Sequence, residues 1–157
     1  MWHSGIALLY SPSCVYAYDD SRRPLYCIRL VGRLSRVDIE ALERDLVAML
    51  EAREPYGCVL DLTEFEFPRS ETMSTAMRIS VRTSKLTKAI YENPAAPVPF
   101  YTAYATSPRL AKFVHYLYRL PARAMAPPQV FASFDEALAA TERALAGFGV
   151  AIPRASA

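Results

Sequence analysis

The sequence predicts an α/β fold with a mixed, mostly parallel sheet of about five strands and four helices. Apolar runs of strand length alternate with stretches of helical period along most of the chain, as in folds built from parallel strands joined by helices. Residues 57–62 are nearly all apolar, which is typical of a parallel strand covered on both faces. Two strand-like runs open the fold with no helix between them, which predicts an antiparallel edge at the N-terminal strands.

The opening strands are predicted at residues 14–18 and 25–34. The first helix is predicted to begin near Ser35, because Ser35 and Asp38 resemble a capping box. Apolar residues then recur at helical spacing between residues 39 and 50, and form the stripe that faces the core.

The second half of the chain continues the alternation. Ser107 and Pro108 are a start signal for a helix, with serine as the cap and proline at the first helical position. The predicted elements are a strand at 57–62, a helix at 70–88, a strand at 98–105, a helix from 108, an edge strand at 129–131 and a helix from 133 to 147.

The length of 157 residues predicts one domain. We expect an N-terminal lead-in at residues 1–12, a single domain at 13–148 and a flexible C-terminal tail at 149–157. The net charge of +2 gives no strong attraction to nucleic acid, and the apolar run at residues 6–10 is too short to insert into a membrane.

The three cysteines are Cys14, Cys27 and Cys58, and they are widely spaced. They form no CxxC motif and no cysteine–histidine pair, so the sequence predicts no zinc site and no other cofactor. We interpret them as reduced residues in or near the core, which predicts a cytoplasmic protein.

The order of elements and one short segment resemble the STAS fold of anti-sigma-factor antagonists and of the cytoplasmic domains of sulfate transporters. Asp61-Leu62-Thr63 is similar to the motif that ends a strand in that family, and Phe67 fits the apolar residue near the end of the following loop. Ser70 stands where the family has its phosphorylatable serine, whereas Arg69 replaces an acidic residue. The C-terminal half resembles a STAS-related branch that shares its fold with the lipid-carrying CRAL-TRIO domains.

This resemblance implies a bacterial regulatory protein with Ser70 as its phosphoacceptor. A phosphate at a helix N-terminus would be stabilised by the unpaired N–H groups there, and it would alter a partner-binding surface. The alternative interpretation is that Ser70 is a simple helix cap, which is a common role of serine.

Basic residues along the second predicted helix form a candidate partner-binding surface. Their spacing keeps them near one side of the helix, although such a face is also typical of a solvated helix surface. The candidate partner-binding residues are Arg69, Thr72, Arg78, Arg82 and Lys85.

The runner-up hypothesis is a module that carries a small molecule or lipid. Its apolar pocket is predicted between the second and third helices, lined by Met73, Met77, Phe113 and Leu117. Edge strands and a tyrosine-bearing helix are also compatible with a homodimer, and the sequence leaves the oligomeric state open.

The sequence predicts that the protein is not an enzyme. It shows no nucleophile–histidine–acid arrangement, no HExxH motif and no glycine-rich phosphate loop. We expect His115, which follows an apolar pair, to be a hydrogen-bonded structural residue. The leading hypothesis is therefore a regulatory or scaffold protein that acts by binding a protein partner.

Overall fold

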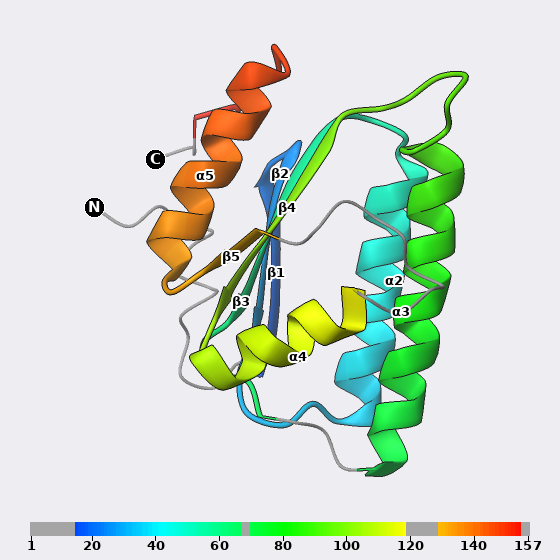
Figure 1. Ribbon diagram of the computed structural model, residues 1–157, viewed down its shortest axis with the longest axis vertical. Helices are drawn as coiled ribbons and strands as arrows, with labels where there is room; N and C mark the ends of the chain where they lie inside the picture. Colours follow the sequence, from blue (N-terminus) through cyan, green and yellow to red (C-terminus); the bar gives the residue numbers. More distant parts are fainter. Residues whose placement is uncertain (1–14, 67–69, 119–128, 155–157) are drawn as a thin grey trace.

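A computed structural model shows one sheet between two helical layers (Figure 1). It describes residues 15–66, 70–118 and 129–154, without the side chains of residues 70–73, 76 and 116–118. The strands are β1 (Tyr16–Arg22), β2 (Leu25–Leu30), β3 (Tyr56–Leu62), β4 (Phe100–Thr106) and β5 (Gln129–Phe131), and the helices are α2 (Arg36–Glu51), α3 (Ser70–Ile90), α4 (Pro108–Tyr118) and α5 (Phe134–Gly147). The predicted α/β class, with five strands and four helices in the described part of the chain, is confirmed.

The five strands lie in the order β1-β2-β3-β4-β5, so every strand neighbours the next one in the sequence. β1 pairs antiparallel with β2, and the other three pairings are parallel. This arrangement confirms the predicted antiparallel edge. Because β2 to β5 run in the same direction, their carboxyl ends meet at one edge of the sheet.

Sequence signals placed the helix starts correctly. Ser35 caps α2 through a complete capping box, in which its hydroxyl accepts from the Asp38 N–H and Asp38 accepts from the Ser35 N–H at 2.8 Å. Ser107 caps α4, since its hydroxyl accepts from the N–H of Leu110 at 3.4 Å. Ser133 caps α5 by accepting from the N–H of Glu136.

The first strand differs from its predicted range of 14–18. β1 extends through Asp19 and Asp20 to Arg22, because this polar stretch still pairs with β2 across a register shift. Polar residues are tolerated there because β1 is an edge strand with less of its surface buried. Cys14, at the predicted start of this strand, lies outside the described residues.

α2, α3 and α4 cover one face of the sheet over large side chains. Buried Tyr26, Ile28 and Cys58 point to this side and pack with Ile39, Leu50 and Ile79 from the helices. Tyr91, 2 % exposed, follows α3 and donates its hydroxyl to the carbonyl of Leu50 at 3.1 Å. This bond joins the end of α3 to the end of α2.

α5 covers the opposite face, where the side chains are small. Ala103, Ala105, Ala137 and Gly57 let the helix approach β3 and β4 closely. A Cβ on Gly57 would lie 2.5 Å from Cγ2 of Thr141, so any larger residue at this position of β3 would have to displace that side chain. After α5, Val150 and Ile152 pack against the same cluster.

Candidate functional site

The carboxyl edge of the sheet brings polar side chains from separate strands together. Arg29 near the end of β2 and Asp61 near the end of β3 are register partners, and Thr106 ends β4. All three are buried, at 8 %, 2 % and 4 % exposure. The chain then leaves this edge at residue 63 to form the segment that leads to α3.

Asp61 fixes the first turn of that segment. Its Oδ1 accepts from the Thr63 N–H at 3.1 Å and from the Thr63 hydroxyl at 2.6 Å. Its Oδ2 lies 3.5 Å from Nε of Arg29, so the buried carboxylate has a buried cation beside it. An aspartate whose carboxylate accepts a hydrogen bond from the backbone N–H two residues onward stabilises a turn that has no regular backbone–backbone hydrogen bonding.

Two further contacts hold the chain up to residue 66. Arg29 donates to Glu64 Oε1 at 2.6 Å, and Arg33 lies 3.1 Å from a carboxylate oxygen of Glu66. Gly32, with φ +63°, exchanges backbone hydrogen bonds with Glu64 and Glu66. Residues 63–66 are thus anchored to the end of β2 immediately before α3.

The predicted phosphoacceptor lies next to this anchored segment. Ser70 is the first residue of α3, as the sequence predicted for a residue at a helix N-terminus. Arg69 lies outside the described residues, and so do the side chains of Ser70 and Thr72.

The basic side of α3 faces solvent and also meets α2. Arg78, Arg82 and Lys85 are exposed. Arg82 forms a 2.8 Å ion pair with Glu43 of α2, whereas Arg78 and Lys85 have no carboxylate within ion-pair distance among the described residues. The sequence did not predict Glu43 as the partner of Arg82, because the residue spacing within α3 carries no information about an acidic residue on a neighbouring helix.

The predicted apolar pocket between α3 and α4 is described only in part. Met77 is half-buried and Phe113 packs against the core, while the side chains of Met73 and Leu117 lie outside the described part of the chain. Neither Met77 nor Phe113 lines the cavity that lies beneath α2 and α3.

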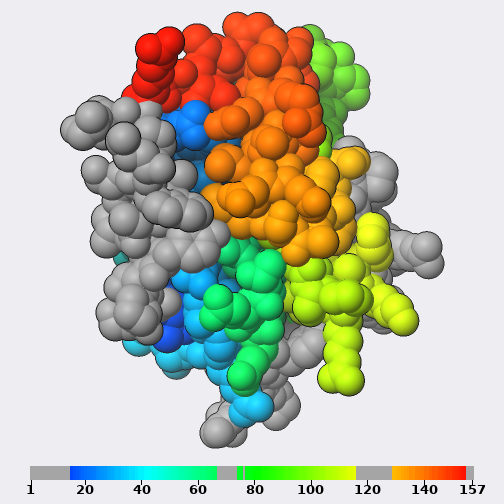
Figure 2. Space-filling view, turned by 90° about the vertical axis from the view of Figure 1, so that its left-hand side faces the viewer, coloured from blue at the N-terminus to red at the C-terminus, as the bar shows by residue number. Residues whose placement is uncertain are grey.

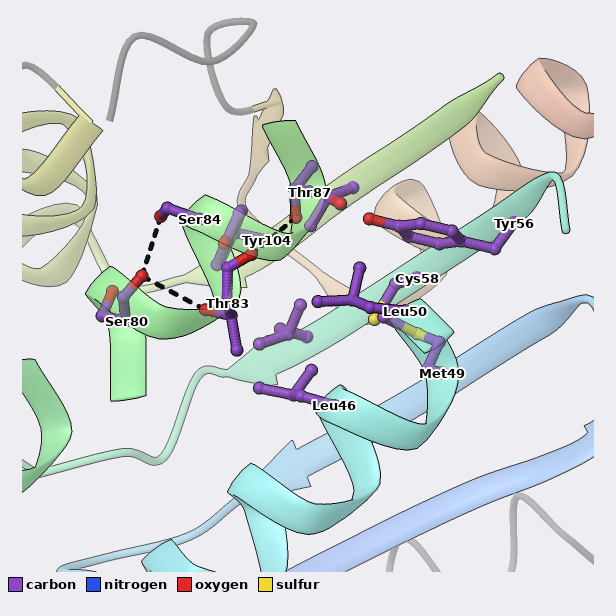
Figure 3. A pocket seen from close by; sticks show the side chains of 12 residues that line it. Leu46, Met49, Leu50, Tyr56, Cys58, Ser80, Thr83, Ser84, Thr87 and Tyr104 are labelled. Atoms are coloured by element: carbon purple, nitrogen blue, oxygen red, sulfur yellow. Dashed lines mark hydrogen bonds between the residues drawn. The ribbon is translucent and has the colours of Figure 1, made fainter. Parts of the chain in front are cut away.

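That cavity has a volume of about 100 Å³ and lies between α2, α3, β3 and β4 (Figure 3). One wall is apolar and the other carries hydroxyl groups. The apolar wall consists of Leu46, Met49, Leu50, Tyr56, Cys58 and Leu60, and the hydroxyl wall of Ser80, Thr83, Ser84, Thr87, Thr102 and Tyr104. Among the residues that the structure describes, no charged side chain lines it.

Three of the four α3 hydroxyls in this wall donate to their own helix. Ser84 donates to the carbonyl of Ser80 at 2.7 Å, and Thr87 donates to that of Thr83 at 2.9 Å, as Figure 3 shows. Thr83 donates to the carbonyl of Ile79 at 3.0 Å. Each of these oxygens therefore keeps only acceptor capacity toward the cavity.

The described thiols are buried and unreactive in character. Burial raises the pKa of Cys27 to about 12 and also raises the pKa of Cys58. Both are free and lie in the core, as predicted. Since the thiolate is the nucleophile, neither is suited to act as one in the folded protein.

The expectation for His115 was wrong, because its side chain is exposed on α4. Among the described residues, no group of three or more histidine, cysteine, aspartate or glutamate side chains is placed to hold a metal ion. The helices of the described ranges include none with the length and apolar character to cross a bilayer.

Comparison with solved structures places this arrangement of elements in a known fold. An uncharacterised DUF3478-family protein from Shewanella loihica PV-4, described as having a SpoIIAA-like fold, matches with a TM-score of 0.54 at 15% identity, over 80% of this chain and 91% of the other. SpoIIAA, an anti-sigma factor antagonist in its unphosphorylated form, also matches with a TM-score of 0.54 at 15% identity, over 82% of this chain and 96% of the other. The chain has a STAS-like fold.

An anti-sigma factor antagonist from Mycobacterium paratuberculosis matches with a TM-score of 0.48 at 20% identity, over 84% of this chain and 97% of the other. No protein-family model and no curated protein sequence matches the chain. At these identities the comparisons establish the fold, as the sequence predicted, and function has to be argued from the site.

Proposed function

We propose that the protein is a non-enzymatic, cytoplasmic regulator that binds a protein partner through residues 63–72 and the exposed side of α3. The observation that carries this proposal is the pair of exposed cations Arg78 and Lys85, which no carboxylate neutralises among the described residues. They lie on a helix that starts next to the anchored segment 63–66. Residues 63–66 and the α3 helix are held in place in the free protein, so these parts of the surface need little ordering on binding.

Phosphorylation of Ser70 would switch this surface. Ser70 begins α3, where the positive end of the helix favours a phosphate. The added charge would also change the electrostatics that a partner meets beside Arg78. The shared fold with SpoIIAA, named as an anti-sigma factor antagonist and solved in an unphosphorylated form, supports a role of this kind.

The first experiment tests the surface. Tagged wild-type protein, Arg78→Glu/Lys85→Glu and Arg143→Glu are used to recover partners from the source cells. Arg143 is exposed on α5, on the opposite face of the sheet, so Arg143→Glu is a single charge reversal away from the surface. We expect the α3 double variant to lose the partner that the other two proteins recover. Equal recovery of the partner by all three proteins would refute the proposal that this surface binds it.

The second experiment tests the switch. Intact-mass measurement of protein purified from its native cells should show a phosphorylated fraction that Ser70→Ala abolishes. Partner recovery should differ between Ser70→Ala and Ser70→Asp. Identical recovery of the partner by both variants, together with an unmodified mass of the native protein, would refute the phosphorylation switch. The proposed binding surface would still stand.

The cavity beneath α2 and α3 supports a second candidate, a carrier of a small neutral molecule. Its volume of about 100 Å³ is below that of an engineered cavity that binds benzene, so it has no room for a lipid chain. Native mass spectrometry would detect a bound ligand, and Ser84→Leu, which fills the cavity, should abolish it. A spectrum without ligand would count against a carrier.

A further inference from the structure

The helix α4 has two faces of different character. Leu110 and Val114 are buried and belong to the core cluster. Arg109, Lys112 and His115 follow one another at intervals of three residues, and all three are exposed. Because the apolar side is anchored in the core, the basic side has a fixed orientation toward solvent.

The charge on this outer face is not balanced locally. Elsewhere in the described part of the chain, most arginines lie within ion-pair distance of a carboxylate, namely Arg22, Arg23, Arg29, Arg33, Arg36, Arg44 and Arg82. α4 contains no acidic residue, and within the described ranges neither Arg109 nor Lys112 has a carboxylate partner. The stripe therefore has an excess of positive charge.

The position of Arg109 adds to this excess. It lies in the first turn of α4, where the helix dipole is positive and where no acidic residue is present. A cation at that end of a helix is electrostatically unfavourable in the free protein. An anionic group bound beside Arg109 would relieve this repulsion and would also interact with the helix N-terminus.

The stripe borders the site described above. Leu62 of β3 and Thr106 of β4 are register partners, so the segment after β3 and the start of α4 leave the sheet side by side. Figure 2 shows them adjacent on one face, with the side chains of α4 projecting from it. A partner that contacts residues 63–66 would therefore reach α4.

We infer that the outer face of α4 binds an acidic helical segment of the partner protein. This inference rests on the proposed function and adds the chemistry of the partner. From Arg109 to His115 the stripe spans about 9 Å, a length that carboxylates spaced three or four residues apart on a facing helix can match.

Two observations favour a protein over the other anionic classes. The net charge of the chain is only +2, which gives little long-range attraction for the dense negative charge of a nucleic-acid backbone. Of the described residues, the exposed large apolar side chains are Val15, Val37 and Phe148, and none lies on α4 to enter a membrane. A protein segment with its own mixture of charges meets neither obstacle.

The test uses an alanine-based peptide of about 20 residues, long enough to be helical, with glutamate at every fourth position. Fluorescence anisotropy of the labelled peptide is measured against the full chain, Arg109→Glu/Lys112→Glu, and Arg143→Glu as the control. We expect the wild type and the control to bind equally and the α4 double variant to bind about tenfold more weakly, with affinity falling as salt is raised. A glutamine version of the peptide should not bind.

Equal binding of the peptide by the α4 double variant, with unchanged circular dichroism, would overturn the inference. So would binding of phosphatidylserine vesicles or of single-stranded DNA that depends on Arg109 and Lys112 when the peptide does not bind. Loss of the cellular partner with the α3 double variant but not with the α4 double variant would overturn this inference and leave the proposed function standing.

Discussion

Replacement of Asp61 by asparagine should strongly destabilise the protein. Asp61 and Arg29 are 2 % and 8 % exposed, so each charge is withdrawn from water and depends on the other. Asparagine keeps an oxygen for the two bonds from Thr63 but removes the negative charge. Breaking a buried ion pair from one side costs about 3–5 kcal/mol.

The remaining partner of Arg29 sets the expected value within that range. Glu64 still accepts from Arg29 at 2.6 Å, although its side chain is 61% exposed and its charge is partly screened by water. We therefore expect a loss near the lower limit, about 3 kcal/mol. For a domain of this size that corresponds to a decrease in Tm of roughly 6–12 °C.

Urea unfolding measures the effect, with the m-value as a check that the same surface is exposed. Glu64→Gln is the matched control and should cost at most about 1 kcal/mol, because its charge is near the surface. Adding Arg29→Met to Asp61→Asn should restore part of the stability, since no unpaired buried charge then remains. The reasoning fails if Asp61→Asn is as mild as Glu64→Gln, or if Arg29→Met only adds to the loss.

Three further outcomes follow from the core. Gly57→Ala should cost about 1–3 kcal/mol because its Cβ would lie 2.5 Å from Cγ2 of Thr141, and Thr141→Ser, which removes that methyl group, should recover part of the loss in urea unfolding. Burial raises the pKa of Tyr91 to about 12 from 10.0, so the stability that depends on its proton is complete below pH 10 and is lost between pH 10 and 12. Tyr91→Phe should therefore lose about 1 kcal/mol at pH 8, where its hydrogen bond is missing, and show a shallower decline above pH 10; equal slopes would contradict this assignment. In a Cys14→Ser background, a thiol reagent at pH 8 should modify Cys27 at least about 100-fold more slowly in the native state than in urea, and comparable rates would show that the thiol is accessible.

The features predicted correctly from sequence are those with local causes. The capping residues Ser35 and Ser107 accept hydrogen bonds from N–H groups three residues onward, so the local sequence is enough to predict where both helices begin. The apolar run of β3 predicted a strand covered on both faces for a similar reason. Each of these signals depends on neighbouring positions only.

The features missed depend on contacts between distant segments. Arg82 forms its ion pair with Glu43, which lies 39 residues earlier on α2, and this pair exists only because α2 packs against α3. The cavity beneath these helices arises in the same way, from side chains of four elements that do not fill the space between them. The prediction for His115 failed because it rested on the apolar pair that precedes this residue. In a helix the next residue points in a different direction, and here it points to solvent.

The strand order has a consequence for how the chain folds as it leaves the ribosome. Because each strand pairs with its predecessor, the sheet can grow from the N-terminus one strand at a time. The small-residue face stays uncovered until α5, the last helix, is synthesised. Nascent chains that stop before residue 134 would therefore expose Val59, Ala103 and Ala105 to solvent, and we expect such truncated chains to bind chaperones or aggregate.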